Sequence, residues 1–472
     1  MDSQFQMKFK NKVAILGFGS IGQAILPLLF KHLGLSSSQV LILTKTTDGR
    51  PIAEKFGLNI QQVTVTEENY FEILNKNLQR GDFLLNLSVG VSSLDLIKYC
   101  QENHILYLDA STEPWEGQYI DPSISASLRT NYALRESVLQ HKKDKASTAI
   151  LTHGANPGLV SHFVKQALLN LALDNDINST KFKKTNDWGR LAQMLEIKAI
   201  HIAERDSQTS NQIKKPKEFV NTWSIEGLIS EASQPAELGW GTHEIHWPQD
   251  AKRHTFGSNC AIYLNRSGVA TKVRTWTPSY GSFNGFLITH AEALSIADYL
   301  TVRSEGEVHY RPTVHYAYYP CPDAILSLHE LEGKEGTQEA LQSEKRFILN
   351  DIIEGTDELG VLLMGNKKGA YWFGSQLSIK EARQLVPYNN ATSLQVVAGV
   401  LAGMMWGIKN PTQGVVEPEN MDHEYVLDLA FPYLGKVGGY YTNWTPLQER
   451  AALFEEQLDP EDPWQFINFR VN

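Results

Sequence analysis

Cysteine is scarce in this sequence of 472 residues, and basic residues are outnumbered by acidic ones. The three cysteines, Cys100, Cys260 and Cys321, form no C-x-x-C pair, which excludes a disulfide framework and a cysteine-rich zinc site. The 43 lysines and arginines against 53 aspartates and glutamates give a net charge of −10. This sign disfavours nucleic acids and anionic membranes as partners, because both bind basic patches.

Targeting signals and long apolar runs are also missing. The polar N-terminus lacks the basic and then apolar order of a signal peptide. No uninterrupted apolar run approaches the ~18 residues of a membrane span. Because few cysteines also fit a reducing compartment, we expect a cytoplasmic protein.

What the sequence does contain is the composition of a globular protein, with 42% hydrophobic and 20% charged residues. Its length is roughly three times the ~150 residues of an average domain, so two or three domains are expected. In the first third, short apolar segments alternate with amphipathic stretches, which is typical of a parallel sheet covered by helices on both faces. Later strands and helices lose this alternation. We therefore predict an α/β fold, with a Rossmann-type doubly wound parallel sheet followed by a second α+β domain.

A glycine-rich loop follows the first predicted strand and opens a helix predicted over residues 21–33. Its glycines fit G-x-G-x-x-G, in which the first permits a tight turn, the second lets the backbone approach a pyrophosphate and the third lets the helix pack on the strand. We expect this loop to bind a dinucleotide, and the alternative is a merely tight structural turn. The expected contacts are Gly17, Gly19, Ser20, Ile21 and Gly22.

The choice between NAD and NADP stays open on these residues. A carboxylate at the end of the second strand normally binds the ribose hydroxyls of NAD, whereas a cation there admits the additional phosphate of NADP. Here Thr44, Lys45 and Thr46 follow the strand, and the first acidic residue is Asp48. Asp48 can reach back to the ribose, or Thr44 can supply a weaker hydrogen bond.

Two further loops follow predicted strands, at the sheet edge where open α/β folds bind ligands. Asp109 ends a buried strand and is followed by Glu113 and Trp115, which we expect near the cofactor. A capped loop with a surface tryptophan explains these residues equally well. Asn156 lies in H-G-A-N-P-G after another strand, where its amide can bind a nicotinamide or a substrate nitrogen. Asparagine before proline is also common in plain turns.

Acidic and aromatic side chains also gather in the second predicted domain. On a predicted strand over residues 196–206, Glu204 and Asp206 continue the apolar face and can line a cationic pocket. Trp223 and Glu231 are eight residues apart, so about two turns of a helix would place them on one face. An indole and a carboxylate together bind an ammonium group through cation–π attraction and ion pairing. The alternatives are a strand running into solvent and a core tryptophan beside a solvated glutamate.

His290 lies inside a pattern that predicts a helix over residues 283–300. On this pattern alone, a buried core histidine is the more frequent interpretation than a catalytic one. His243, Glu244 and His246 are too closely spaced for the H-E-x-x-H zinc signature, and we predict no metal site.

Together, these segments resemble the bacterial homospermidine synthases, which are similar in fold to saccharopine and carboxynorspermidine dehydrogenases. The resemblance covers most of the chain in order, and the segments beyond the glycine loop are far more specific than that loop. They are GFGSIG at 17–22, LDASTEPW at 108–115, HGANPG at 153–158, AERDSQ at 203–208, TWSIEGLISEA at 222–232, QPAELGWGTHE at 234–244 and PSYGSFNGFLITHAEALSIADYL at 278–300.

The resemblance implies a transferase that uses NAD as a recycled cofactor. One putrescine is oxidised to an imine by hydride transfer to NAD, and ammonia leaves as a second putrescine attacks. The same NADH then reduces the new imine to homospermidine. Putrescine is therefore the expected partner, with spermidine and 1,3-diaminopropane as further candidates, and a homodimer is expected.

Residue roles follow from the same resemblance. Trp223 would hold the substrate cation or imine, and Glu231 would anchor the ammonium end. Asn156 would orient the reacting nitrogen, and His290 would assist proton transfer. The substrate pocket would gain its negative field from Glu113, Glu204 and Asp206, and the cofactor would contact Thr44, Asp109 and Asn156 besides the glycine loop.

The implied architecture has a dinucleotide-binding domain over residues 1–155 and a substrate-binding and dimerisation domain over 156–390. Residues 407–472 would form a C-terminal extension. The helix expected over 391–406 is apolar and rich in glycine and alanine, so it can pack back closely on the first domain.

Two other functions compete with this one. A nicotinamide dehydrogenase that forms a secondary amine, as saccharopine dehydrogenases do, would bind its carboxylate-bearing substrates through paired cations. Arg205 keeps this alternative open, and stoichiometric use of NADPH would favour it. A non-catalytic dinucleotide sensor is the second alternative, and it would form no new polyamine from putrescine and NAD.

Overall fold

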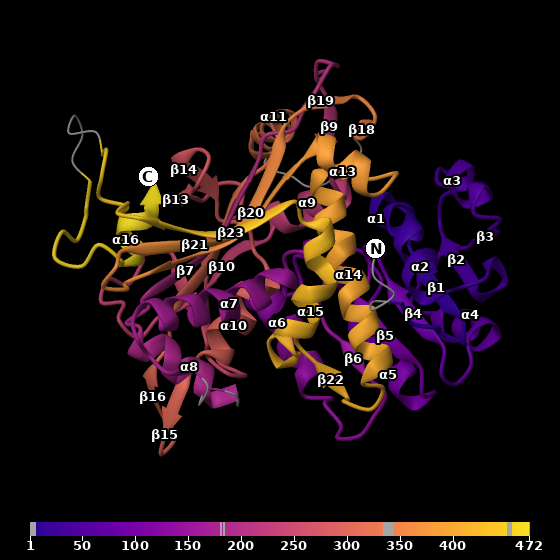
Figure 1. Cartoon of the computed structure of the whole chain (residues 1–472), viewed down its shortest axis with the longest axis horizontal. Helices are drawn as coiled ribbons and strands as arrows, with labels where there is room; N and C mark the ends of the chain where they lie inside the picture. The colour runs from indigo at the N-terminus through magenta and orange to yellow at the C-terminus, as the bar shows by residue number, and fades with distance from the viewer. Residues whose placement is uncertain (1–5, 180–181, 183–184, 334–343, 451–455, 472) are drawn as a thin grey trace.

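The computed structural model of the chain describes residues 6–179, 182, 185–333, 344–450 and 456–471. The described residues form two large β-sheets that lie side by side and are covered by helices (Figure 1). A long helix, α14 (Ala391–Lys409), runs between them and contacts strands of both.

The first sheet has seven parallel strands in the order β22-β6-β5-β4-β1-β2-β3. From β1 the strands are laid down first on one side and then on the other, which is the Rossmann order and confirms the predicted fold. The last strand, β22, comes from the C-terminal part of the chain. The strands are β1 (Val13–Leu16), β2 (Val40–Thr44), β3 (Ile60–Gln62), β4 (Phe83–Asn86), β5 (Leu106–Asp109), β6 (Ala149–Ile150) and β22 (Val415–Val416).

Alternation along these strands explains why both faces are covered. Val13 and Ile15 belong to a core shared with α2 and α14, whereas Ala14 and Leu16 belong to a core shared with α4 and α5. The helix predicted over residues 21–33 is in fact two helices, with Pro27 in the first turn of the second. The helices are α1 (Ser20–Ala24), α2 (Leu26–Leu33), α3 (Arg50–Lys55), α4 (Tyr70–Asn77), α5 (Ser93–Glu102) and α6 (Asn131–Leu139).

The second sheet is mixed, has eleven strands and confirms the predicted α+β domain. Near its middle, β7 runs parallel to β17 and antiparallel to β20. Its strands are β7 (Ala199–Asp206), β10 (Pro235–Gly239), β11 (Ala251–Arg253), β12 (Ala261–Ser267), β13 (Lys272–Thr277), β14 (Gly281–Phe286), β17 (Thr313–Tyr319), β20 (Thr356–Met364), β21 (Ala370–Ser378), β23 (Lys436–Thr442) and β24 (Arg470–Val471).

Helices and short ribbons surround this sheet. Three two-stranded ribbons pair β8 (Thr209–Ser210) with β19 (Ile352–Glu354), β9 (Glu218–Asn221) with β18 (Glu344–Phe347), and β15 (Val302–Ser304) with β16 (Glu307–Tyr310). The helices are α7 (Leu159–Asp174), α8 (Thr185–Met194), α9 (Ile225–Ser233), α10 (Ala291–Tyr299), α11 (Pro322–Glu332), α13 (Ile379–Leu385), α15 (His423–Ala430) and α16 (Phe466–Phe469).

The helix predicted over residues 283–300 is wrong in its first half. The segment up to Phe286 is strand β14, and the helix begins only at Ala291. Tertiary pairing decides this, because Phe286 pairs with Tyr318 of β17 and a Cβ at Gly285 would lie 2.9 Å from the backbone nitrogen of Tyr318. His290 is therefore the N-cap residue of α10 and not a mid-helix residue.

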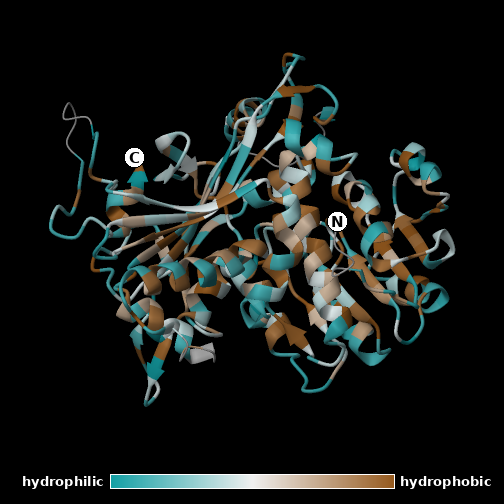
Figure 2. Cartoon of the chain, in the orientation of Figure 1, coloured by the Kyte–Doolittle hydropathy of each residue, from teal (hydrophilic) through white to brown (hydrophobic). Residues whose placement is uncertain are grey.

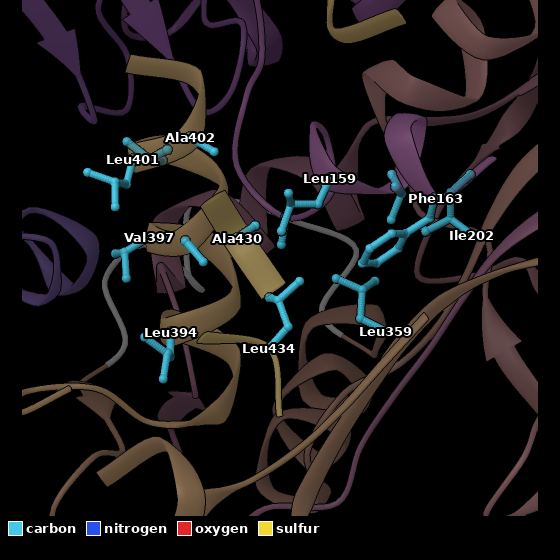
Figure 3. Packing of buried hydrophobic residues seen from close by; sticks show 14 of the residues in the cluster. Leu159, Phe163, Ile202, Leu359, Leu394, Val397, Leu401, Ala402, Ala430 and Leu434 are labelled. Carbon is cyan, nitrogen blue, oxygen red and sulfur yellow. The ribbon is translucent and has the colours of Figure 1, made fainter. Parts of the chain in front are cut away.

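The central helix α14 joins the two halves through apolar packing. Its Leu394, Val397 and Leu401 belong to one cluster with residues of α7, β7 and β20 (Figure 3). Figure 2 shows hydrophobic residues along this helix and along the strands of the first sheet. Among the described residues it is the one helix long and apolar enough to cross a membrane by length and mean hydropathy, although Thr392, Ser393 and Gln395 interrupt its apolar run. However, 89% of its apolar window is buried inside the protein, as in a core helix.

Residues 407–472 contribute to both halves. They supply β22 to the first sheet, and β23 and β24 to the second, while α15 packs on α7 and α14.

Candidate active site

A cavity of about 120 Å³ lies between the two halves, beyond the carboxyl ends of β4, β5 and β6. The first half lines it with the loops that follow these strands. The second half adds side chains from β7, from β17, from α9 with the two residues before it, and from the N-cap of α10, and α14 adds Thr392 and Val396. Open α/β sheets bind their ligands at this edge.

A second cleft, of about 190 Å³, adjoins the cavity and shares residues 87–89 with it. The glycine loop lines this cleft. A Cβ at Gly17 would lie 2.6 Å from the carbonyl oxygen of Leu87, whereas a Cβ at Gly19 would meet nothing within 4 Å. The loop is therefore tightly turned on its inner side and open on its outer side. This cradle fits the pyrophosphate of a dinucleotide beside the first turn of a helix.

The end of β2 also lines the cleft. Thr44, Lys45 and Thr46 face it, whereas Asp48 is not part of its described lining. Two carboxylates do line it, Glu116 and Glu226 of α9, and Glu226 pairs with Lys345 at 2.6 Å.

Asp109 ends β5 as expected, but its carboxylate points inward. It is fully buried and accepts hydrogen bonds from the backbone N–H of Thr152 at 2.6 Å and from the hydroxyl of Tyr107 at 2.8 Å. Burial raises the pKa of Asp109 to about 6. The described lining of the cavity and of the cleft does not include it. In this structure Asp109 ties neighbouring strand ends together at the ligand-binding edge.

Asn156 is held at the cavity by close contact between its loop and α14. A Cβ at Gly399 would overlap the carbonyl oxygen of Gly154, and the ring Nδ1 of His153 lies 2.9 Å from the Gly399 carbonyl oxygen. In this position the amide of Asn156 donates to Oε2 of Glu204 at 2.7 Å. The expected asparagine is thus in the cavity, and a helix more than 230 residues away fixes its loop there.

Alanine at Gly399 should push this loop off the helix. Overpacking of this kind costs about 1–3 kcal/mol of unfolding free energy, and we expect the displaced Asn156 to raise KM for the substrate as well. Denaturant unfolding and steady-state kinetics measure both effects. Gly407→Ala is the matched control on the same helix, because its Cβ would meet side-chain atoms and no backbone, the nearest being the end of Ile150 at 3.2 Å. Equal stability and KM in the two variants would contradict the assigned contact.

Glu204, on β7, is the buried acceptor at the inner wall. Besides Asn156, the hydroxyl of Tyr316 donates to its Oε2. Burial raises the pKa of Glu204 to about 7, although both hydrogen bonds oppose that shift. Asp206 follows on the same face, but it accepts from the backbone of Gln208 and the hydroxyl of Thr222 and does not line the cavity. Only one of the two expected carboxylates therefore faces the substrate space.

Trp223 forms an aromatic wall of the cavity. Its Nε1–H donates to the hydroxyl of Tyr318 at 3.0 Å, and its ring packs so closely on Gly227 that a Cβ there would lie 3.0 Å from it. Trp223 precedes α9 and Ser224 is the N-cap, so the expected shared helix face with Glu231 is wrong. Both side chains nevertheless line the same cavity.

Glu231 and His290 meet at the cavity, with Oε2 of Glu231 at 3.0 Å from the ring Nε2. The centroid of the His290 ring also lies 4.3 Å from the centroid of the Tyr316 ring. Burial lowers the pKa of His290, but the charges of Glu292 and Glu231 outweigh it, and the pKa lies well above its ordinary value. The expected catalytic histidine is therefore next to the expected ammonium anchor.

Glu113 is the third carboxylate of the lining. It accepts a hydrogen bond from the hydroxyl of Ser111 at 3.2 Å, and burial together with the charge of Glu231 raises its pKa to about 8. Trp115 lies outside the cavity and donates its Nε1–H to Asp95 at 2.8 Å.

Apart from His290, the charged side chains of the lining are all acidic. The lining contains Glu113, Glu204 and Glu231 and, among the described residues, neither lysine nor arginine. Arg205, the one cation that kept a carboxylate-binding site open, lies over the ring of Tyr280 at 3.7 Å and is not part of the lining. A cavity of this kind attracts cations, and it offers a substrate carboxylate no free partner because His290 is engaged by Glu231 and Glu292.

Sequence analysis missed three residues of this arrangement, Tyr316, Glu292 and Thr392. Tyr316 sits in the apolar strand T-V-H-Y-A-Y-Y, in which alternation gives no sign that one hydroxyl meets Glu204. Glu292 lies two residues beyond His290, in the first turn of α10, so its short spacing from the histidine is the signal that could have predicted the contact. The described residues hold no group of three potential metal ligands.

Comparisons with known proteins agree with this geometry. The saccharopine dehydrogenase NADP binding domain matches residues 13–151, and the saccharopine dehydrogenase C-terminal domain matches residues 154–441. Homospermidine synthases of Mesorhizobium japonicum and Blastochloris viridis are each 48% identical, over 97% and 98% of this chain and 96% and 98% of theirs.

Solved structures give the same result. Homospermidine synthase of Legionella pneumophila in complex with NAD is 52% identical and superposes over 100% of both chains with a TM-score of 0.93. Apo saccharopine dehydrogenase (L-Glu forming) of Saccharomyces cerevisiae is 10% identical and covers 91% of this chain and 99% of its own, with a TM-score of 0.52. The second likeness is one of fold alone.

Proposed function

This chain belongs to the homospermidine synthase family, within the wider saccharopine dehydrogenase family, and from that membership we propose that it joins two putrescine molecules into homospermidine with NAD as a recycled cofactor. The observation that carries the proposal is the cavity lining, in which carboxylates and an indole without lysine or arginine adjoin a dinucleotide cleft. A diamine, a dication at neutral pH, is the substrate that such a lining recognises.

The reaction balances without any net oxidation. One putrescine becomes an imine at the carbon beside an amine, the amine of a second putrescine adds to that carbon, and ammonia leaves. The new imine is reduced, so two putrescines yield homospermidine and ammonia. Bound NAD supplies the hydride acceptor for the first half and the hydride donor for the second. The glycine loop and Thr44 would hold it, with Glu226 facing the same cleft.

We assign the binding of substrate cations to two side chains, one just before α9 and one in its second half. Trp223 would lie against the cation or the imine, and Glu231 would pair with the far ammonium. Glu113 would add to the negative potential from the side of the first sheet. These roles use side chains that share one cavity.

The reacting nitrogen has a different requirement, since an amine must lose its proton before it gives up hydride or attacks an imine. Glu204 is suited to take part in this, because burial raises its pKa to about 7 and it is joined to Asn156 and Tyr316. Asn156 would orient the nitrogen and His290 would take up a proton once its own has left. Asp206 and Asp109, which lie outside the cavity lining, would hold the neighbouring backbone and hydroxyl groups in place through their buried hydrogen bonds.

Product analysis tests the proposed function. The protein is incubated with putrescine and substoichiometric NAD, and homospermidine and ammonia are expected in equal amounts without accumulation of NADH. A parallel incubation with 1,3-diaminopropane measures the tolerance for chain length. Stoichiometric consumption of NADPH would instead favour the dehydrogenase, and the absence of any new polyamine would favour the dinucleotide sensor.

Assembly, location and domain limits are part of the same proposal. We infer a homodimer in the cytoplasm, with a dinucleotide domain to residue 155, a substrate domain over 156–390 and the remainder completing both. Support for the first limit comes from the family matches, which meet between residues 151 and 154, whereas the second match continues to residue 441.

A further inference from the structure

His290 lies between two carboxylates that come from different elements. On the cavity side, its Nε2 is 3.0 Å from Oε2 of Glu231, which belongs to α9. On the protein side, its Nδ1 is 3.1 Å from Oε1 of Glu292, in the first turn of α10. Glu292 is 1% exposed and is not part of the described cavity lining.

These two contacts determine how many protons Glu231, His290 and Glu292, together called the trio, hold between them. A neutral imidazole has one N–H and one ring lone pair, so it can donate to only one of the two carboxylates. At the other contact a lone pair would face a carboxylate oxygen unless a further proton lies between them. The trio therefore holds one proton more than a neutral histidine and two carboxylates would.

The surroundings favour His290 as the carrier of this proton. Glu292 and Glu231 together outweigh the effect of burial and raise the pKa of His290. The other titratable groups that face the trio are neutral or acidic, namely Glu113, Tyr119, Glu204 and Tyr316. Since the described lining has no lysine or arginine, no neighbouring cation opposes the charge on the ring.

Glu292 depends on His290 in turn. Its second oxygen, Oε2, is buried without a hydrogen-bonding partner among the described residues. A buried carboxylate with one free oxygen is costly unless a charge compensates it, and the imidazolium is the cation within hydrogen-bonding reach. The first turn of α10 adds a favourable dipole but no proton.

We propose that Glu292 is a positioning residue that holds His290 as a resident cation against Glu231, in the place taken by a diamine ammonium, so that a diamine binds by expelling a proton. This inference rests on the proposed function, because it takes a diamine as the ligand. An ammonium that pairs with Glu231 meets the imidazolium as a like charge, and loss of the Nε2 proton to solvent removes the repulsion. The ring keeps its Nδ1–H on Glu292 and turns a free lone pair toward the substrate.

Calorimetry measures this exchange. Putrescine is titrated into the enzyme loaded with NADH, which cannot oxidise it, in two buffers with different ionisation enthalpies near neutral pH. Wild type should release up to about one proton more per putrescine than Glu292→Gln, in which His290 loses a carboxylate partner. The putrescine affinity of wild type should also rise with pH, because binding releases a proton. This rise should lie at higher pH in wild type than in Glu292→Gln, since it follows the pKa of His290 in the free enzyme and Glu292 raises that pKa. Protons lost by putrescine itself are common to both proteins.

Glu419→Gln is the matched control, because Glu419 is a buried carboxylate that also touches α10, through Ser295, but lies outside the cavity. It should release as many protons as wild type. If Glu292→Gln does not fold, His290→Gln provides the same comparison, because it removes the titrating ring. Equal proton release by wild type and these variants, with binding intact, would overturn the inference. Failure of wild type to bind putrescine would instead overturn the proposed function.

Discussion

Alanine in place of Trp223 should lower kcat/KM for putrescine by about 30-fold or more. A desolvated cation over an indole gains about 2 kcal/mol, and each 1.4 kcal/mol corresponds to a factor of ten. The indole is also the aromatic wall of the cavity and packs on the first turn of α9, so its loss admits water beside the substrate. Homospermidine formation under initial-rate conditions measures the effect.

Two further variants separate the cation role from simple packing. Trp223→Phe keeps a π-face but loses the hydrogen bond to Tyr318, so we expect a smaller loss than with alanine. Trp247→Ala serves as the control, because this indole is 42% exposed, pairs with Arg253 and lies outside the cavity. A folded Trp223→Ala protein with near-normal turnover would refute the cation role.

Replacement of Glu231 by glutamine should raise KM for putrescine by about 10- to 100-fold, with a smaller change in kcat. A hydrogen bond to a charged group contributes about 1.5–3 kcal/mol, and the Glu231 side chain is only 15% exposed, so solvent does not replace it. Glutamine keeps the size and removes the charge. Steady-state kinetics over a range of putrescine concentrations gives the two constants separately.

A monoamine makes this prediction specific. n-Butylamine has no far ammonium, so its KM as the attacking amine should be the same in wild type and Glu231→Gln. Glu330→Gln is the control. Glu330 belongs to α11, its side chain is 40% exposed, and it pairs with Lys214. An equal rise in KM for putrescine and butylamine would show that Glu231 acts on something other than the far ammonium.

The sequence by itself determined the dinucleotide half of this protein. Short apolar strands, a glycine loop at a strand end and loops at the following strand ends are local features, because each depends on a few neighbouring residues. The rule that ligands bind at the carboxyl edge then brought Glu113 and Asn156 to the cavity correctly. The quoted segments also carried the family resemblance, which the relatives confirm.

Local patterns failed where side chains point the same way but meet different neighbours. Glu204 and Asp206 share one strand face, yet only Glu204 reaches the cavity, since Thr222 and Gln208 engage Asp206. Asp109 ends its strand as predicted but turns inward to Thr152 and Tyr107. Periodicity gives the face of a strand and not the groups packed against it.

Only the tertiary structure decided the chemistry around the substrate. Tyr316 reaches Glu204 across 112 residues, and His290 reaches Glu231 across 59. Such pairs form because separate strands and helices pack together. Burial there raises the pKa of Glu204, and the charges of Glu292 and Glu231 raise the pKa of His290. No window of sequence contains both partners, so neither the proton count of His290 nor the inward place of Asp206 can be read from the chain alone.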